Sequence, residues 1–481
     1  MFAQYFVGML PAARNKAPTL TLNRVSSSFN SFAGGVLRKQ LVSVRAFSGS
    51  QRNAQSHKGG APRPSTFLSG KLRMALAIGS GGIALAGYTL SQYLNDQASK
   101  EVEADDSVPL SPTLAALKSI ELKHQASKTV LDGLEGQEQH HKAVSLDELS
   151  DDEVDALLQA KENAWCIESQ FSKAKLQVST SQISSNNHCE DYLTYSDLTT
   201  TQASEKGNES GLHMFGIFDG HNAKCHEIIA QNQDLQKLHE VQYGLSGSGG
   251  LVAIVDTNDK EIVVGNAGDS RALVGVLQDD GTWKAVRLTD DQTSVRVLEY
   301  VRVMGEHPGE DNAIQGGRVL GSLRHARAFG DIKYKWPLDV QKDIFPSLNN
   351  LGYHSVQAPE HCITPPYVTS YPVLRRHKLS SNDKFVVLAS GGLYDKLSND
   401  QVIETVAKWY EANNANKKES AGSLAVKDSN ASTHLIRAAL SIDWHGTQGN
   451  STVRRLLAIP SPHSRQYHND ISVTVVTLDI E

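Results

Sequence analysis

Cysteine is scarce in this chain of 481 residues, which has only four. Cys166, Cys189, Cys225 and Cys362 are scattered, without the paired spacing that is typical of zinc-binding or redox motifs. We interpret them as isolated structural thiols. The hydrophobic fraction of 39% and the charged fraction of 21% are ordinary for a soluble globular protein. The length allows one large domain with extensions or two to three average domains.

Acidic residues are absent from the first 95 positions, which contain 11 basic residues. The remainder then holds 36 basic and 53 acidic residues, so the net charge of -6 conceals a strong asymmetry. A basic, serine-rich, acid-free N-terminus is typical of a mitochondrial presequence, and Arg45-Ala46-Phe47-Ser48 resembles a processing site. We predict a presequence over 1–47 and a basic linker over 48–73. A nucleic-acid-binding arm is the alternative, but it lacks an accompanying aromatic platform, so we expect no nucleic-acid partner.

Charge is also absent from residues 74–94, which are long enough to cross a bilayer as one helix. Basic residues precede this stretch and acidic residues follow it. The positive-inside rule then leaves the N-terminal flank in the mitochondrial matrix. We predict a helix in the inner membrane, an acidic tether over 95–144, and a folded domain that faces the intermembrane space. The alternatives are a buried Gly/Ala helix for the stretch and the matrix for the domain.

The folded domain is predicted to span 145–481, because Ser150 to Glu153 has the pattern of a capping box ahead of a short amphipathic helix. Strands predominate beyond it. The apolar runs 251–255 and 261–264 flank a turn signal and predict a hairpin. Further expected elements are strands at 271–276, 384–389 and 471–476, and helices beginning after Ser398 and near Thr433. Mainly antiparallel strands with helices outside them indicate an α+β fold.

Asp219-Gly220-His221 follows the apolar run 214–218. A strand that ends in aspartate and glycine suits a divalent cation, since the carboxylate supplies a hard oxygen and glycine permits close approach. Further short motifs follow in order: Ser246-Gly247-Ser248-Gly249, Gly268-Asp269-Ser270-Arg271-Ala272, Asp290-Asp291-Gln292-Thr293, Arg327-Ala328-Phe329-Gly330-Asp331 and Asn469-Asp470-Ile471-Ser472-Val473. Each alone is an ordinary turn. The ordered set resembles the metal-dependent serine/threonine phosphatases of type 2C (the PPM family).

Other segments resemble the mitochondrial pyruvate dehydrogenase phosphatase branch of that family, among them Glu306-His307-Pro308-Gly309-Glu310 and Thr364-Pro365-Pro366-Tyr367. The resemblance implies a sandwich of two antiparallel β-sheets flanked by helices, with two Mg²⁺ or Mn²⁺ ions where the sheets meet. Such ions activate a shared water for in-line attack on phosphoserine or phosphothreonine. The resemblance assigns metal binding to Glu190, Asp219 and Gly220, general acid catalysis to His221, and a weaker third ion to Asp269 and Asp395.

Two positions that should carry metal-binding aspartates carry other residues. Gly391 offers no side-chain oxygen, and Asn469 offers a neutral amide oxygen in place of a carboxylate. We do not expect Asp470 to substitute, because neighbouring residues on a strand point to opposite faces. Changes outside the ligand shell already cost roughly 10–100-fold in metal affinity or activity. We therefore predict reduced metal occupancy and weak or absent hydrolysis.

Only 24 residues separate His221 from Ser246, where the family has a long helical stretch. A shortened helical region leaves one sheet face thinly covered, which invites a partner, lowers stability or reflects a missed exon. Three interpretations remain open. The protein is a mitochondrial phosphatase acting on a phosphoprotein such as the pyruvate dehydrogenase complex, a pseudophosphatase that serves as a binding or regulatory module, or a passive membrane-tethered scaffold.

Overall fold

The computed structural model describes residues 112–132, 147–169, 172–186, 189–198, 211–221, 244–350, 356–414, 427–442 and 449–480. All of them belong to the compact unit 83–481. The predicted presequence (1–47), linker (48–73) and membrane helix (74–94) lie outside the described residues, as do residues 222–243 of the shortened segment. Within the described ranges, no helix is both long and apolar enough to cross a bilayer.

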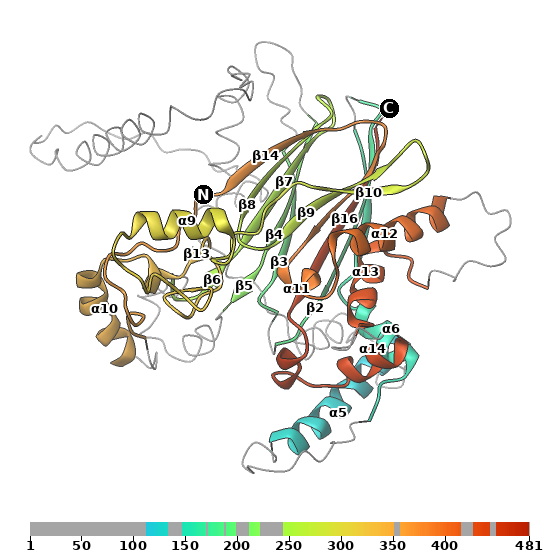
Figure 1. The fold of residues 1–481 in the computed structure, drawn as a ribbon. Coiled ribbons are helices and arrows are strands. Elements are labelled where there is room, and N and C mark those ends of the chain that lie inside the picture. The colour runs from blue at the N-terminus through green and yellow to red at the C-terminus, as the bar shows by residue number, and fades with distance from the viewer. Residues whose placement is uncertain are drawn as a thin grey trace, which may run out of the picture. The chain divides into compact units, whose positions relative to one another are not determined.

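Two antiparallel sheets form the centre of the domain (Figure 1). The six-stranded sheet has the order β1 (Asn163–Glu168), β2 (Lys175–Ile183), β16 (Ile471–Asp479), β15 (Asp383–Ala389), β9 (Arg271–Leu277) and β10 (Trp283–Arg287). The five-stranded sheet has the order β14 (Val373–Lys378), β8 (Glu261–Ala267), β7 (Gly250–Asp256), β4 (Leu212–Phe218) and β3 (Tyr192–Asp197). The α+β sandwich of two antiparallel sheets is therefore confirmed.

The core between the sheets follows from the alternation of side chains along each strand. On β7, Leu251, Ala253 and Val255 are buried on one face, where they pack with Phe215 and Ile217 of β4. The predicted hairpin is present, because β7 pairs with β8 from Gly250 opposite Ala267 to Asp256 opposite Glu261. The other strands expected from the sequence are also found, as β9, β15 and β16.

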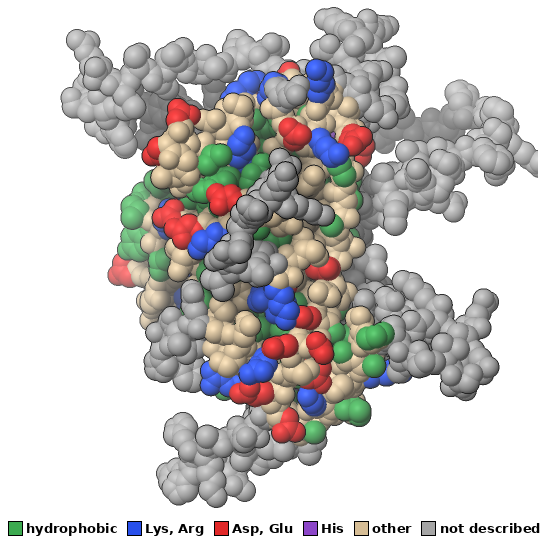
Figure 2. Space-filling view, turned by 90° about the vertical axis from the view of Figure 1, so that its right-hand side faces the viewer, with side chains coloured by type: hydrophobic (Ala, Val, Ile, Leu, Met, Phe, Trp, Pro, Cys, Tyr) green, Lys and Arg blue, Asp and Glu red, His purple; other side chains and the backbone are tan. Residues whose placement is uncertain are grey.

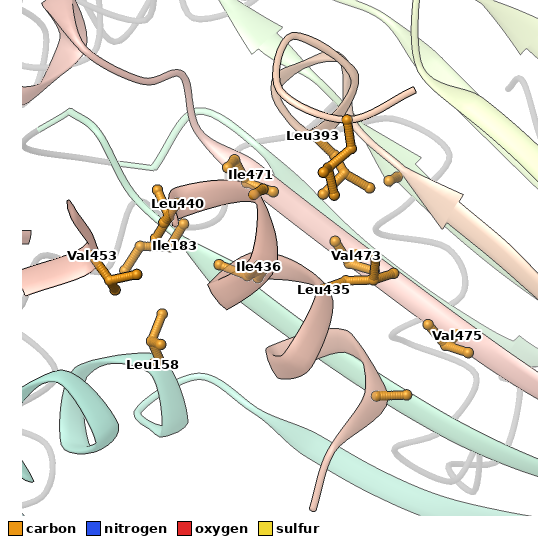
Figure 3. Close-up of a cluster of buried hydrophobic side chains, with 14 of the residues drawn as sticks. Leu158, Ile183, Leu393, Leu435, Ile436, Leu440, Val453, Ile471, Val473 and Val475 are labelled. Carbon is orange, nitrogen blue, oxygen red and sulfur yellow. The ribbon is translucent and has the colours of Figure 1, made fainter. Parts of the chain in front are cut away.

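Helices lie on the outer side of the six-stranded sheet, three of them (the second to fourth named below) against its strands and the other two against those helices. They are α5 (Pro112–Asp132), α6 (Asp151–Gln159), α12 (Asn399–Asn414), α13 (Ala431–Leu440) and α14 (Asn450–Leu457). Figure 3 shows Leu435 and Ile436 of α13 close to Val473 and Val475 of β16, within one buried cluster. The predicted capping box is confirmed, since the Ser150 hydroxyl accepts from the Glu153 N–H while the Glu153 carboxylate accepts from the Ser150 N–H.

The predicted tether over 95–144 is wrong for residues 112–132, which form α5 and pack against α6. Leu117 and Ile120, three residues apart on one helix face, are fully buried there. Ser119 Oγ and Lys123 Nζ both donate to the Glu153 carboxylate, at 2.7 and 2.8 Å. The folded unit therefore begins before residue 145, because a few apolar contacts suffice to hold an otherwise polar helix.

A long excursion between β10 and β14 forms a smaller cluster with its own core. Its buried residues include Val303, Val319, Tyr334 and Tyr367. Its elements are α9 (Val297–Glu306), β11 (Ile314–Gln315), β12 (Arg318–Val319), β13 (Phe329–Gly330), η2 (Ile332–Tyr334) and α10 (Leu338–Asn350). Strand β13 pairs with β6 (Gly247–Ser248), which pairs with β5 (Gly220–His221). This small sheet ties the excursion to the Asp219-Gly220-His221 turn.

Figure 2 presents one face of the molecule, on which acidic and basic side chains are interspersed with hydrophobic ones. The acidic excess of the sequence is therefore not gathered into one patch on the described part of that face. The remaining short elements are α11 (Gly391–Tyr394), which follows β15 in the sequence, and η3 (His463–Gln466), which precedes β16.

Candidate functional site

The predicted site residues lie where strands of the two sheets end. Asp219 follows β4 of the five-stranded sheet, whereas Gly391 follows β15 of the six-stranded sheet. Asp269 lies in the turn from β8 to β9, where the chain crosses from one sheet to the other. The Gly391 N–H donates to Asp219 Oδ2 at 2.8 Å. The two sheets therefore meet at these residues, as the family resemblance implied.

Gly391 lies between two carboxylates. A Cβ built on Gly391 would be 2.9 Å from Asp269 Oδ1 and 3.3 Å from Asp219 Oδ2. A side chain at this position would therefore point into the acidic cluster, and an aspartate there would add a third carboxylate. With glycine, the position contributes only a backbone N–H to Asp219. The carboxylate oxygens that an aspartate would supply at this position are therefore missing from the centre of the cluster.

Asn469 lies beside the same turn, two residues before β16, the strand that pairs with β15. Its Cβ is 3.0 Å from the position that a Cβ on Gly392 would take. Its amide oxygen accepts from the Asp470 N–H at 2.9 Å. That oxygen is thus already used by the backbone.

Asp470 has a role that the sequence did not reveal. One carboxylate oxygen accepts from the N–H and hydroxyl of Ser185, at 2.6 and 2.7 Å, and the other accepts from the Glu190 N–H at 2.7 Å. Asp470 therefore positions the loop that carries Glu190. The sequence gives no signal of this contact, because Asp470 and Glu190 are 280 positions apart. In the structure, the pairing of β2 with β16 brings the two segments together.

The Glu190 loop packs directly on Gly220. A Cβ on Gly220 would lie 2.2 Å from the Glu190 carbonyl oxygen, so only glycine fits there. The Glu190 carboxylate accepts from the Asn186 amide at 3.1 Å. The structure thus brings Glu190 and Gly220 together, while their metal-binding roles remain predictions.

His221 is fixed on two sides. Its Nε2 lies 2.9 Å from Asp331 Oδ2, and its ring stacks on the ring of His325 with the centroids 5.2 Å apart. Asp331 is fully buried and has a left-handed backbone, with φ of 52°. Gly247 is required beside them, because a Cβ there would lie 2.0 Å from His221 Nε2. The assigned role of His221 as a general acid stays a prediction.

Two basic residues that the sequence did not single out lie in the acidic cluster. His325 Nε2 is 3.1 Å from Asp269 Oδ1, and Arg324 Nε is 3.7 Å from Asp269 Oδ2. Arg324 Nη1 also lies 3.5 Å from Asp395 Oδ1. The signal in the sequence is an Arg-His dipeptide shortly before the Arg327-to-Asp331 motif. Its meaning depends on contacts with residues more than 50 positions away.

These contacts shift the ionisation of the cluster. Burial, together with the charge of Asp269, raises the pKa of Asp219 to about 6, although His325, the Gly391 N–H and His221 oppose the shift. Burial also acts to raise the pKa of Asp269, but His325 and Arg324 outweigh it and lower that pKa to about 2. Burial disfavours a charged His325, yet Asp269 raises its pKa to about 9.

The donor set does not fit two divalent cations. Two dications need several carboxylates to offset their mutual repulsion. Position 391 supplies none, Asn469 is neutral, and both oxygens of Asp269 face basic side chains. Across the described ranges, no three His, Cys, Asp or Glu side chains are arranged so that they could hold a metal ion.

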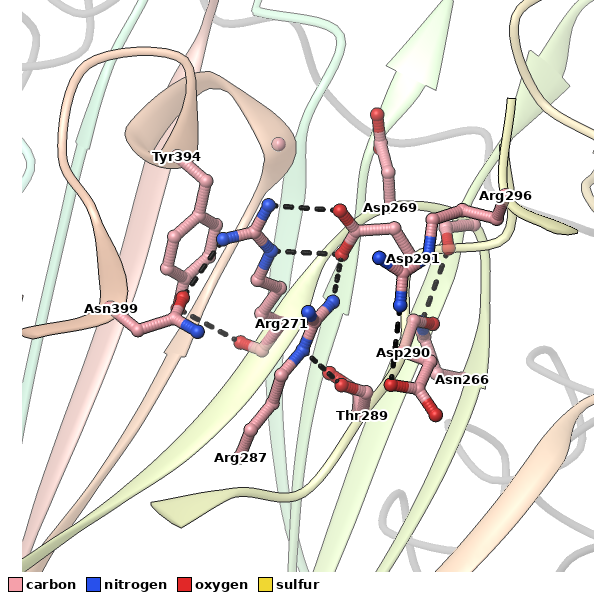
Figure 4. A network of polar contacts seen from close by, with 12 residues as sticks. Asn266, Asp269, Arg271, Arg287, Thr289, Asp290, Asp291, Arg296, Tyr394 and Asn399 are labelled. Carbon is pink, nitrogen blue, oxygen red and sulfur yellow. Dashed lines mark hydrogen bonds and ion pairs between the residues drawn. The ribbon is translucent and has the colours of Figure 1, made fainter. Parts of the chain in front are cut away.

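A separate network of hydrogen bonds and ion pairs joins the start of β9 to the segment after β10 and to the start of α12 (Figure 4). The Asp291 carboxylate accepts two bonds from Arg271, both at 2.8 Å, and a third from Arg287 at 2.6 Å. Arg271 also donates to Asn399 at the start of α12, and its guanidinium lies 4.5 Å from the centre of the Tyr394 ring. The turn that contains Gly391 is thereby fixed to β9.

Comparison with known proteins identifies the class. The family described as protein phosphatase 2C matches residues 193–445, more than half of the chain, so the chain belongs to this family. It is 34% identical over 269 residues to the mitochondrial [pyruvate dehydrogenase [acetyl-transferring]]-phosphatase 1 of Saccharomyces cerevisiae, covering 48% of this chain and 46% of that protein. It is 36% identical over 263 residues to the human phosphatase 2, covering 50% and 49%.

The resemblance to the pyruvate dehydrogenase phosphatase branch is therefore confirmed, and the matches span about half the length of these relatives. Among solved structures, a serine-threonine phosphatase 2C from Toxoplasma gondii matches at 14% identity with a TM-score of 0.37, covering 66% of this chain and 99% of that one.

Proposed function

We propose that this protein is a phosphatase 2C domain of the pyruvate dehydrogenase phosphatase type whose turnover is lost or severely weakened, and which acts as a binding or regulatory module for a phosphoprotein. The proposal rests mainly on Gly391, whose N–H donates to Asp219 and whose side-chain position faces Asp219 and Asp269, but which has no side-chain oxygen. Hydrolysis in this family depends on Mg²⁺ or Mn²⁺, which activates the attacking water and neutralises the phosphoryl group. A cluster without carboxylates at 391 and 469 supports that chemistry poorly.

Retained turnover is the second candidate, and His221 favours it. The ring is held by Asp331, and His221 follows Asp219 by two positions in the sequence. In an active enzyme His221 would give its proton to the departing serine or threonine oxygen, while Asp331 would keep the ring in place. Glu190 and Asp219 are also retained at the positions that the family uses.

The relatives indicate a partner and a compartment. Their names contain pyruvate dehydrogenase and the word mitochondrial. This supports a mitochondrial location and a phosphorylated dehydrogenase complex as substrate or partner. The inner-membrane helix over 74–94 and the orientation toward the intermembrane space remain part of the proposal. Protease protection in mitochondria with ruptured outer membranes tests them, since a domain that stays protected would lie in the matrix.

Phosphatase assays decide between the two candidates. The full chain is incubated with Mn²⁺ and a phosphoserine peptide, beside human phosphatase 2 as an active reference. We expect little turnover from the wild type and a rise of roughly tenfold or more in Gly391→Asp/Asn469→Asp, because two anionic ligands are restored. The matched control is Gly305→Asp/Asn413→Asp, which makes the same changes at exposed helical positions. Wild-type turnover comparable to the reference would reject the proposal.

A further inference from the structure

The acidic cluster at the sheet junction contains cations of its own. Asp219, Asp269 and Asp395 converge there from three different turns, and Arg324 and His325 reach Asp269 and Asp395 from a fourth. Carboxylates that share a partly buried site repel each other unless a positive charge lies between them. The question is therefore which cation neutralises this cluster in the folded protein.

His325 takes the oxygen that faces the missing ligand. Asp269 Oδ1 is the atom nearest to the position of a Cβ on Gly391, at 2.9 Å, and the same atom lies 3.1 Å from His325 Nε2. The His325 side chain is only 16% exposed and is held flat against His221. The imidazole thus occupies the side of Asp269 that an additional carboxylate and its cation would need.

Arg324 bridges the other carboxylates of the cluster. Its guanidinium lies 3.7 Å from Asp269 and 3.5 Å from Asp395, and its side chain is half exposed. An arginine is charged at every physiological pH, so this positive charge is permanent. Between them, the two basic residues face both oxygens of Asp269 and one of Asp395.

The backbone holds both residues in place. The Ser294 N–H donates to the Arg324 carbonyl at 3.0 Å, and the Ala326 N–H donates to the Gln292 carbonyl at 2.9 Å. His325 itself forms an isolated β-bridge with Thr293. Bonds on either side of the dipeptide fix its direction, so the two side chains do not meet the acidic cluster by chance rotation of a loose loop.

We propose that the Arg324 guanidinium, with the His325 imidazole packed beside it, serves as an internal counter-cation for the Asp219, Asp269 and Asp395 cluster in place of a divalent metal ion. The domain then folds and remains stable without Mg²⁺ or Mn²⁺, and the same pair obstructs metal binding at Asp269. This goes beyond the proposed loss of turnover, because it concerns how the site is neutralised and not whether it hydrolyses phosphate.

The test compares thermal stability and Mn²⁺ binding, measured by thermal melts in EDTA or in Mn²⁺ and by electron paramagnetic resonance of Mn²⁺. The full chain carries Arg324→Gln/His325→Gln, which removes the guanidinium charge and the imidazole ring and keeps polar side chains. We expect the wild-type Tm to be the same in EDTA and in Mn²⁺. We expect the variant to melt several degrees lower in EDTA, to recover in Mn²⁺, and to bind Mn²⁺ roughly tenfold or more tightly than the wild type.

A second Arg-His dipeptide in the same chain provides the matched control. Arg376 lies 3.4 Å from Glu261, and His377 lies 3.2 Å from Asp383, on strand β14. We expect Arg376→Gln/His377→Gln to lower the Tm by the same amount in EDTA and in Mn²⁺. A control that becomes metal-dependent would overturn the inference, because the effect would then not be specific to the acidic cluster.

Two further outcomes overturn the proposal. One is a wild type that gains as much stability from Mn²⁺ as the Arg324→Gln/His325→Gln variant does, and the other is a variant that is insensitive to the metal. If the double variant does not fold, Arg324→Gln and His325→Gln answer the question singly, and the inference fails if neither acquires a metal-dependent Tm. None of these readouts is phosphatase activity, so the result is independent of the turnover assay.

Discussion

Two mostly buried acidic sites lie in or next to the short turn between β8 and β9, one around Asp291 and one around Asp269. Their negative charge is neutralised differently. Asp291 receives three hydrogen bonds of 2.6 to 2.8 Å from Arg271 and Arg287. Asp269 lies 3.1 Å from His325 and 3.7 Å from Arg324. Both carboxylates are mostly buried, with exposed fractions of 14% and 8%. The first cluster is thus closed by short bonds, whereas the second is held by longer ion pairs.

The ratio of charges also differs. Around Asp291, two arginines donate hydrogen bonds directly to one carboxylate. Around Asp269, two basic residues serve three carboxylates, since Asp219 and Asp395 belong to the same cluster. A saturated cluster indicates a structural role. The Asp269 cluster, in which carboxylates outnumber basic side chains, should be more sensitive to an added charge.

The largest expected effect comes from breaking the saturated cluster. Asp291→Asn should lower the free energy of unfolding by about 3–5 kcal/mol, because it leaves two partly buried arginines without their carboxylate. Urea unfolding measures the loss, which we expect to be equal with and without Mn²⁺. The neighbouring Asp290→Asn is the control, since its partners Arg296 and Arg375 are well exposed and such pairs contribute about 0–1 kcal/mol. Similar losses from both variants would contradict the distinction.

A smaller effect is expected from adding charge to the unsaturated cluster. Gly391→Asp should cost about 1–3 kcal/mol in EDTA, because its Cβ crowds Asp269 and a further carboxylate joins Asp219, Asp269 and Asp395. In Mn²⁺ the loss should shrink, as the metal binds the folded state. Gly391→Ala separates the causes, since it brings the crowding without the charge and should lose the same stability in both buffers. A metal-insensitive Gly391→Asp would show that crowding alone decides.

The sheets were predictable from the sequence because strand periodicity is local. The run 251–255, the turn after it and the run 261–264 carry alternation and turn signals within about a dozen residues, and they form β7 and β8. The resemblance to the type 2C phosphatases then implied which strand ends meet. Asp219 and Gly391 were accordingly expected at one place, and a hydrogen bond joins them.

The remainder of the site depends on pairs that are distant in the chain. Nothing near His325 in the sequence shows that it meets Asp269, 56 positions earlier. Nor does the strand around Asp470 show that its carboxylate holds the Glu190 loop. Helix α5 was missed for a related reason, since its buried apolar residues Leu117 and Ile120 give a weak periodicity that only the partner helix α6 makes meaningful.

The smallest expected effect comes from the contact between α5 and α6, where the Glu153 carboxylate pairs with Lys123. Burial acts to raise the pKa of Glu153, but bonds from Lys123, the Ser150 N–H, and the hydroxyls of Ser119 and Ser150 outweigh it and lower the pKa to about 2. An unfolded glutamate has a pKa of about 4.3. The stabilisation is therefore complete above that value and is lost as the pH falls through the folded pKa of about 2.

Glu153→Gln should accordingly cost about 1 kcal/mol at pH 7, the size of a typical hydrogen-bond or ion-pair loss. Urea unfolding between pH 7 and pH 3 should show this difference holding steady down to about pH 5 and shrinking below it, because the wild-type carboxylate then gains protons in the unfolded chain. Asp152→Asn removes a charge from the same turn of α6 at an exposed position. If Asp152→Asn lowers the stability as much as Glu153→Gln, then the Glu153 carboxylate stabilises the N-terminus of α6 and not the docking of α5.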